Sequence, residues 1–217
     1  LQQLLNPGVS LEMHHFTDAN RGMLYVYTVT AAMYNFGFVA LLTLRHVQRL
    51  RDLTLHDPLT GLLNRRALDA ELVREWQRLQ RDGEAFALLA LDLDHFKHVN
   101  DRFGHLAGDE VLAETAARLQ VAVRGFDLVA RTGGEEFVVL MPRMDADGAR
   151  AAAERLRLAV SATPYRLGSD DLPVSVSVGV AWVARAQGDP RAALQRADRA
   201  LYQAKAQGRD RIVMAPA

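Results

Sequence analysis

The chain has 217 residues, 49% of them hydrophobic, which suits one good-sized core with an appendage rather than two full domains. Its 26 basic and 26 acidic residues balance, so no overall charge draws it to nucleic acid, which is not an expected partner. Cysteine is absent, which excludes disulfides and thiolate metal sites and leaves oxygen or histidine as metal ligands.

An apolar run without charged residues follows the N-terminal segment 1–21 and occupies positions 22–44. Its 23 positions match the roughly 20 residues that a helix needs to cross a bilayer. Arginines follow it closely, so we expect a transmembrane helix in the inner (cytoplasmic) membrane, with the rest of the chain in the cytoplasm. Asn35 weakens the apolar signal, and a buried or dimer-forming helix is the alternative. Because the chain opens on Leu1 rather than Met, we expect a sensory part upstream.

Residues 45–56 keep apolar side chains at helical spacing and are expected to form a helical stalk that ends near Asp57 and Pro58. From 57 to 217, helical and strand patterns alternate, which predicts an α/β domain. We expect a mixed central β-sheet covered by helices, with one β-hairpin, preceded by the N-terminal helix. The expected helices cover 64–81, between Asn64 as cap and Gly83, and 107–123, 146–162 and 190–206; the expected strands cover 85–94, 127–131, 135–141, 173–183 and 211–214.

The expected hairpin carries two glycines followed by two glutamates. Gly133 and Gly134 predict a two-residue turn with positive φ at both positions, and they let a ligand approach the backbone closely. Successive side chains of a strand face opposite ways, so only one of Glu135 and Glu136 is expected to point at a ligand unless the turn distorts the pleat. For an isolated motif, a solvated hairpin tip is the alternative.

Two carboxylates stand at the end of the expected strand 85–94. Asp92 and Asp94 share one face of the strand by alternation, and burying such a pair is costly unless a cation or hydrogen-bond donors compensate. Paired carboxylates suit Mg²⁺, which is usually held together with the phosphates of a substrate. The nearby histidines raise zinc as an alternative, but cysteine and a zinc-binding spacing are both absent; they are His95, His98 and His105.

Three motifs together resemble the signature of GGDEF-domain diguanylate cyclases. The beginning "DPLTGLLNRR" at 57–66 and the ending "ADRALYQAKAQGRDRI" at 197–212 are also similar to that family, so the resemblance covers 57–217. The motifs are Asp92-x-Asp-x-Phe-Lys97-x-x-Asn100-Asp101, Phe-Gly-His105-x-x-Gly-Asp109 and Gly133-Gly134-Glu135-Glu136-Phe137.

The resemblance implies a nucleotidyl-cyclase-like fold that condenses two GTP molecules into cyclic di-GMP with release of two pyrophosphates, at the interface of an antiparallel homodimer. It implies that Asp92 and Glu135 bind Mg²⁺, or Mn²⁺ in its place, with the Leu93 carbonyl and Glu136 as further ligands. Asp92, Glu135 and Glu136 are then the catalytic residues, and no general base is assigned. A catalytically silent module that senses GTP or cyclic di-GMP is one alternative, and a structural dimerisation appendage is another.

The resemblance also implies which residues contact the GTP nucleotide and which of them bind its guanine base. Gly133 and Gly134 would contact the nucleotide. The amide of Asn100 can give and accept hydrogen bonds, and the carboxylate of Asp109 can accept from the guanine N–H groups. Helix capping by Asn100 and Asp109 is the alternative.

Phosphate binding is implied for three basic residues. The chain has two lysines, Lys97 and Lys205, and both match the family's phosphate-binding positions. Lysine offers a compact point charge, which differs from the planar arginine group. Arg209 would join Lys205 about one helical turn later.

A product site is implied by the spacing Arg-x-x-Asp at Arg124 and Asp127, where the family binds cyclic di-GMP and is inhibited, with Arg155 as a further arginine. The motif alone is common here, because 49–52 and 66–69 match it too. Only the copy at 124–127 lies on the strand approach to the hairpin, where the family keeps it, and a surface ion pair is the alternative.

Overall fold

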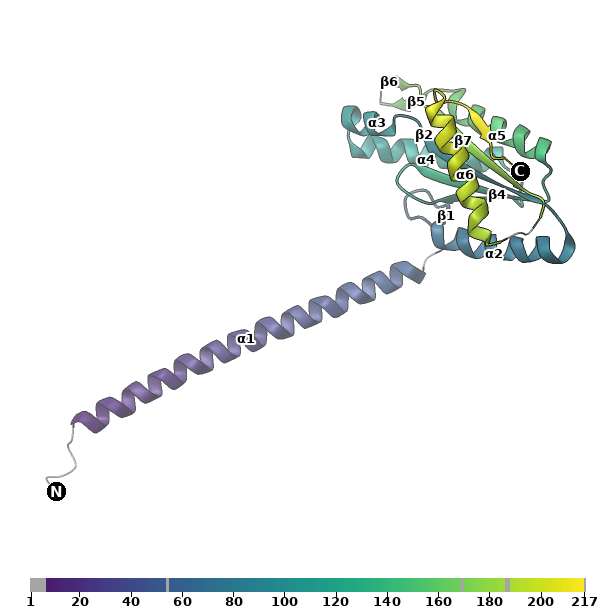
Figure 1. Ribbon diagram of the computed structural model, residues 1–217. Coiled ribbons are helices and arrows are strands. Elements are labelled where there is room, and N and C mark those ends of the chain that lie inside the picture. The colour runs from purple at the N-terminus through teal and green to yellow at the C-terminus, as the bar shows by residue number, and fades with distance from the viewer. Residues whose placement is uncertain (1–6, 54, 169, 186–187, 217) are drawn as a thin grey trace. The chain divides into compact units, whose positions relative to one another are not determined.

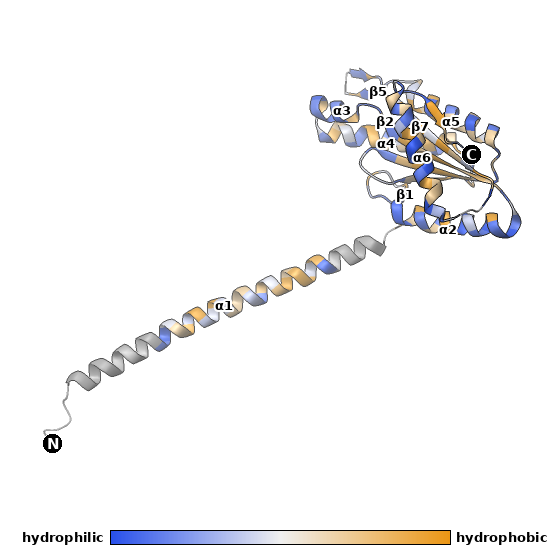
Figure 2. Cartoon of the chain, viewed as in Figure 1, coloured by the Kyte–Doolittle hydropathy of each residue, from blue (hydrophilic) through white to orange (hydrophobic). Residues whose placement is uncertain are grey.

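The computed structural model describes residues 7–53, 55–168, 170–185 and 188–216, and the chain divides after Thr54 into two units. The first unit contains the helix α1 (Pro7–Leu53). Within α1, the stretch Asn20–Arg45 is long and apolar enough to cross a membrane, and none of it is buried within the structure. Figure 2 shows this stretch as largely hydrophobic. Residues 1–6 of the predicted N-terminal segment, and position 54 of the predicted stalk, lie outside the described residues.

Within the apolar stretch of α1, Asn35 and several threonine side chains bond to their own helix. Asn35 donates to the carbonyl of Ala31 at 2.8 Å, and the Thr30 hydroxyl donates to the carbonyl of Val26 at 2.7 Å. Donors satisfied one turn back in the same helix need no water, which lowers the cost of placing them in a bilayer. Asn35 therefore opposes a membrane span less than the polarity of its side chain alone indicates.

The second unit is built on a six-stranded mixed sheet, as predicted (Figure 1). The two outer pairs, β1 with β3 and β7 with β8, are parallel, and the inner pairs are antiparallel. The strands in spatial order are β1 (Leu63–Asn64), β3 (Leu128–Arg131), β4 (Glu136–Pro142), β2 (Phe86–Leu93), β7 (Val176–Val183) and β8 (Ile212–Met214).

Helices cover both faces of the sheet, because β2 is buried along its whole length and needs apolar cover on each side. On one face, even-numbered β2 residues such as Leu88 pack with α2 (Arg65–Asp82) and α6 (Pro190–Ala206). On the other, odd-numbered residues such as Leu89 pack with α3 (Phe96–Phe103), α4 (His105–Ala122) and α5 (Ala146–Ser161).

The helix ends follow the predicted caps. The Asn64 side chain accepts a hydrogen bond at the start of α2, and Gly83 ends this helix in the left-handed conformation. Asp189 caps α6, with Pro190 in its first turn. Short elements were not predicted: α3, β1 and the separate hairpin of β5 (Tyr165–Leu167) and β6 (Asp170–Leu172). They have too few residues to show a periodic pattern.

The predicted two-residue turn is wrong. Strand β3 ends at Arg131 and β4 begins at Glu136, so the connection is longer than two residues. Neither Gly133 nor Gly134 has a left-handed φ. The Thr132 N–H donates to the Glu136 carbonyl at 2.9 Å, which closes a wider loop. Longer hairpin loops do not need the paired positive φ values of the tight turn.

Candidate active site

The carboxylates of the hairpin and of strand β2 meet at one end of the sheet. Asp92 stands opposite Glu136 on β4 and opposite Ser177 on β7. Its side chain is buried, with 6% of the residue exposed. The Ser177 hydroxyl donates to Asp94 at 2.7 Å, which places Asp92 and Asp94 on the same face, as alternation predicted.

The electrostatics of this group show excess negative charge. Burial is the main cause that raises the pKa of Asp92, and the charges of Glu136 and Asp94 raise it further, against the opposing effect of Lys205. Burial also raises the pKa of Glu135, and the next cause is the charge of Asp92. The charges of Glu135 and Glu136 thus both interact with that of Asp92, and which of the two points at a ligand stays a prediction.

Lys205 compensates part of this charge. Its ammonium lies 2.7 Å from a carboxylate oxygen of Asp92. Helix α6 comes close enough because Gly179 of β7 has no side chain: a Cβ there would lie 2.1 Å from the Ala197 carbonyl oxygen and 2.1 Å from the Leu201 nitrogen. Gly179 therefore allows α6 to pack closely on the sheet, which brings Lys205 to the sheet end.

The two predicted guanine-binding residues are brought together by α3 and α4. Asn100 lies on α3 and is half-buried, and Asp109 lies exposed near the start of α4. Between them, a Cβ at Gly108 would lie 2.0 Å from Asn100 Oδ1. The Asn100 amide thus rests on the backbone of α4, directly before Asp109.

Two further predicted substrate residues, Lys97 and Arg209, are exposed. Lys97 lies on α3, three positions before Asn100 and so on the same side of the helix. Arg209 lies in the turn after α6, where it has a left-handed φ of 60°. This turn starts immediately beyond Lys205.

Arg131 holds the hairpin loop, a role that the sequence did not reveal. It donates to the Gly134 carbonyl at 2.8 Å and forms an ion pair of 3.0 Å with Asp57. Asp57 in turn accepts from the Thr60 N–H and hydroxyl. The loop with the two glycines is therefore fixed to the entry segment of the domain.

The three residues of the predicted product site lie near one another. Asp127 is buried and accepts a hydrogen bond of 2.9 Å from the backbone N–H of Arg124, rather than from its guanidinium. Arg155 donates from α5 to the carbonyl of Ala122, which lies two residues before Arg124. The alternative of a surface ion pair between the two side chains is therefore not supported, because the bond to Asp127 comes from the backbone of Arg124.

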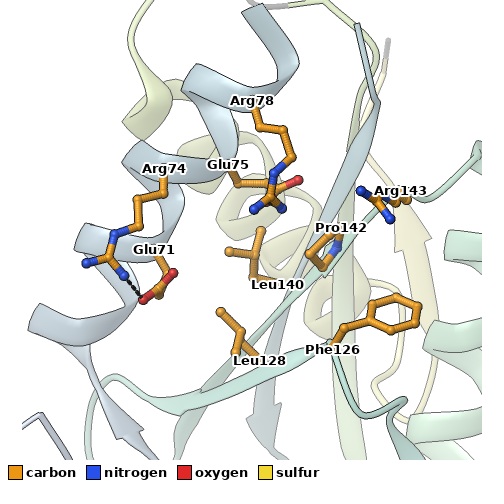
Figure 3. Close-up of a pocket in the computed structure, with 9 residues that line it drawn as sticks. All are labelled: Glu71, Arg74, Glu75, Arg78, Phe126, Leu128, Leu140, Pro142 and Arg143. Carbon is orange, nitrogen blue, oxygen red and sulfur yellow. Dashed lines mark hydrogen bonds and ion pairs between the residues drawn. The ribbon is translucent and has the colours of Figure 1, made fainter. Parts of the chain in front are cut away.

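A pocket of about 400 Å³ adjoins this loop (Figure 3). Asp92, Glu135 and Glu136 are not among the residues that line it. Phe126, from within the Arg124–Asp127 loop, lines it. The pocket lies where β3 begins at Leu128 and β4 ends at Pro142. Along β4, Pro142 is six positions from Glu136, which pairs with Asp92. At about 3.3 Å per residue, that separation is on the order of 20 Å.

The oxygen donors fit a hard divalent cation. Asp92 is buried beside other carboxylates that raise its pKa, and these are the conditions that a cation relieves. In the described part of the chain, no three Asp, Glu or His side chains are already grouped to hold an ion. Lys205 pairs with Asp92 instead, so a cation at Asp92 would compete with the Lys205 ammonium.

The fold and the site define an α/β domain with an acidic, lysine-bearing end of its sheet. Comparisons with known proteins identify the family. The model of "Diguanylate cyclase, GGDEF domain" matches residues 54–211. The chain therefore belongs to the GGDEF-domain family of diguanylate cyclases.

Individual relatives agree with this assignment. The diguanylate cyclase DgcP of Pseudomonas aeruginosa is 46% identical over 171 residues, which are 78% of this chain and 25% of DgcP. The chain thus spans about a quarter of the length of this curated relative.

Solved structures agree as well. Diguanylate cyclase SiaD of Pseudomonas aeruginosa, in complex with its activator SiaC, matches with a TM-score of 0.72 and 37% identity over 99% of this chain and 87% of SiaD. The coiled coil and GGDEF domain of DgcB from Caulobacter crescentus, in complex with c-di-GMP, matches with a TM-score of 0.71 and 30% identity over 86% of this chain and 99% of that one.

Proposed function

We propose that this chain is an active diguanylate cyclase that condenses two GTP molecules into cyclic di-GMP. The observation that carries the proposal is the meeting of Asp92, Glu135 and Lys205 at one sheet end, in a member of a cyclase family. In each of two steps, a 3′-hydroxyl oxygen attacks the α-phosphorus of the other GTP. The bond to the β-phosphate bridging oxygen breaks, and pyrophosphate leaves as the hydroxyl loses its proton.

Asp92, Glu135, Glu136 and the Leu93 carbonyl supply hard oxygen ligands for Mg²⁺, or Mn²⁺ in its place. When bound, the metal would neutralise phosphate charge and orient the attacking and leaving oxygens. With Asp92 holding the metal, the Lys205 ammonium, now paired with that carboxylate, would be free to bind the phosphates. Positioning and charge neutralisation carry such reactions, with little covalent chemistry by the protein.

Base recognition falls to Asn100 and Asp109, and phosphate recognition to Lys97, Lys205 and Arg209. A carboxylate and an amide together match the guanine edge, which presents N–H donors beside a carbonyl. Gly133 and Gly134 leave the hairpin loop free of side chains that would block the nucleotide.

Two GTP molecules must meet, so we propose that two copies of this domain face each other in an antiparallel homodimer. The apolar stretch Asn20–Arg45 would anchor the chain in the inner membrane, with the catalytic domain in the cytoplasm. A shared membrane raises the local concentration of the partner domains.

Product inhibition is proposed at Arg124, Asp127 and Arg155. One oxygen of Asp127, Oδ1, is buried and has no hydrogen-bond partner in the described structure. A carboxylate oxygen in that state favours a donor such as a guanine N–H group. The site is on the order of 20 Å from the carboxylates, so product bound there would not compete directly with GTP.

The test is to incubate the full chain in detergent with GTP and Mg²⁺ and to detect cyclic di-GMP by mass spectrometry. Glu135→Ala should abolish synthesis, whereas Glu71→Ala, which removes a distant surface carboxylate, should not. The rate per protomer should rise with protein concentration. A folded chain that binds GTP or cyclic di-GMP and makes no product would be the silent sensing module instead.

A further inference from the structure

The turn that follows α6 has an unfavourable backbone conformation. Gly208, Arg209 and Asp210 have φ values of 113°, 60° and 43°. Non-glycine residues rarely adopt positive φ, because Cβ then crowds the backbone. Such a turn persists only where neighbouring groups hold it.

Asp94 is the first of these groups. It accepts hydrogen bonds from the hydroxyls of Ser175 at 2.8 Å and Ser177 at 2.7 Å, and from the backbone N–H of Asp210 at 3.1 Å. Only 7% of Asp94 is exposed. With both oxygens engaged by these donors, Asp94 serves as an anchor, unlike Asp92 one step along the same face.

Arg157 is the second. This residue of α5 reaches across to Asp210, with 2.5 Å between a guanidinium nitrogen and Asp210 Oδ1. A second nitrogen of the same guanidinium lies 2.6 Å from a carboxylate oxygen of Glu154. The Arg157 side chain is 15% exposed and that of Asp210 is 48% exposed, so the guanidinium is the partner that is shielded from solvent.

We propose that Asp94 and Arg157 are positioning residues that hold the left-handed turn and thereby present Arg209 to the triphosphate of GTP. The inference rests on the proposed function, in which Arg209 binds phosphate. Asp94 fixes the backbone of Asp210, and Arg157 fixes its side chain. Arg209 is then pre-ordered next to Lys205, so less conformational freedom is lost when the phosphates bind.

The experiment compares two ligands by calorimetry on the full chain in detergent. One is a GTP analogue with a methylene group between the α- and β-phosphorus atoms, and the other is GMP, which lacks the outer phosphates. Arg157→Ala should weaken binding of the analogue by about the same factor as Arg209→Ala and leave GMP affinity unchanged. The double variant should bind no more weakly than Arg209→Ala alone, because both changes remove one interaction.

Two further variants guard against general loss of structure. Asp210→Asn keeps a residue type that tolerates the left-handed conformation but lacks the charge, and should reproduce the Arg157→Ala effect. Glu154→Ala removes the other partner of Arg157 while leaving Asp210 in place, and should bind the analogue like the parent. Arg157→Lys should restore part of the loss.

The outcomes separate this inference from the proposed function. If Arg209→Ala weakens analogue binding while Arg157→Ala and Asp210→Asn do not, the positioning role is overturned and the phosphate role of Arg209 stands. If the losses from Arg157→Ala and Arg209→Ala add, or if GMP binding falls equally, Arg157 does not act through Arg209. If Arg209→Ala has no effect, the phosphate role fails and this inference fails with it.

Discussion

Replacing Gly108 by Ala should impair guanine recognition while the domain stays folded. The added Cβ would lie 2.0 Å from Asn100 Oδ1 and 3.2 Å from Phe96 Cζ. The first distance is impossible for non-bonded atoms, so the Asn100 amide has to leave its place. It is the end of a side chain that can rotate, at a cost of about 0.5–1.5 kcal/mol.

The loss of binding can be worked out from the displaced amide. Loss of a hydrogen bond that leaves a donor or acceptor of the base unpaired costs about 1–3 kcal/mol. This cost is equivalent to roughly 5- to 150-fold weaker binding. Against the rotamer cost, Ala is favoured over Gly inside a helix by about 0.5–1 kcal/mol. We therefore expect the free energy of unfolding to stay within about 1 kcal/mol of the parent.

Calorimetry with the methylene analogue of GTP measures the binding, and urea denaturation measures the stability. Asn100→Ala should lose a similar factor, and the Gly108→Ala, Asn100→Ala double variant should lose nothing further. Gly179→Ala supplies the contrast: its Cβ would meet backbone atoms of α6 that cannot rotate away, so overpacking should cost about 1–3 kcal/mol or more of stability.

Unchanged affinity for the analogue in a folded Gly108→Ala variant, with Asn100→Ala impaired, would refute this reasoning. Asn100 would then reach the base by another rotamer. Equal loss of affinity for the corresponding ATP analogue would also contradict it, since displacement of a base-reading amide should reduce the preference for guanine.

Three other predictions concern pH, feedback and the membrane. The raised pKa of Glu135 means that the native state keeps its proton to higher pH than the unfolded chain, so stability falls as pH rises from about 4.3 through the folded-state value. Glu135→Gln removes that loss, and its stability relative to the parent should increase from pH 4 to pH 7; an equal difference at both pH values in urea denaturation would be evidence against this. Arg124→Ala should keep the initial rate of synthesis but lose inhibition by added cyclic di-GMP, and a progress curve that flattens like the parent's would show that Arg124 is not a product ligand. The full chain should sediment with membranes after a high-salt wash, whereas a chain beginning at Arg45 should not; release of the full chain by salt alone would exclude a span at 22–44.

The sequence predicted most of the architecture because long elements have a clear periodicity. The run at 85–94 lies at the centre of the sheet, and the caps Asn64 and Asp189 start their helices where expected. The glycine pair in the hairpin was misread, because the identity of two residues does not fix loop length. The backbone hydrogen bond from Thr132 to Glu136 sets the length of the loop, and no local sequence pattern predicts this bond.

The candidate site likewise has residues that the sequence predicts and contacts that it does not. Spacing and resemblance predict those site residues that lie within a motif, such as Asp92 and Asn100. Gly108 stood inside a recognised motif as well, but the contact that explains it involves a neighbouring helix, and only coordinates reveal it.

Contacts that join distant parts of the chain were beyond the sequence altogether. The bond from the Asp210 N–H to Asp94 spans 116 positions, and the bond from Arg157 to Asp210 spans 53. Asp94 looked like a second metal ligand because it shares a face with Asp92, yet its oxygens are already engaged by hydroxyls and an N–H. Two carboxylates of the same type, two positions apart, thus differ in their partners: the Lys205 ammonium reaches Asp92, whereas two hydroxyls and the N–H of a turn reach Asp94.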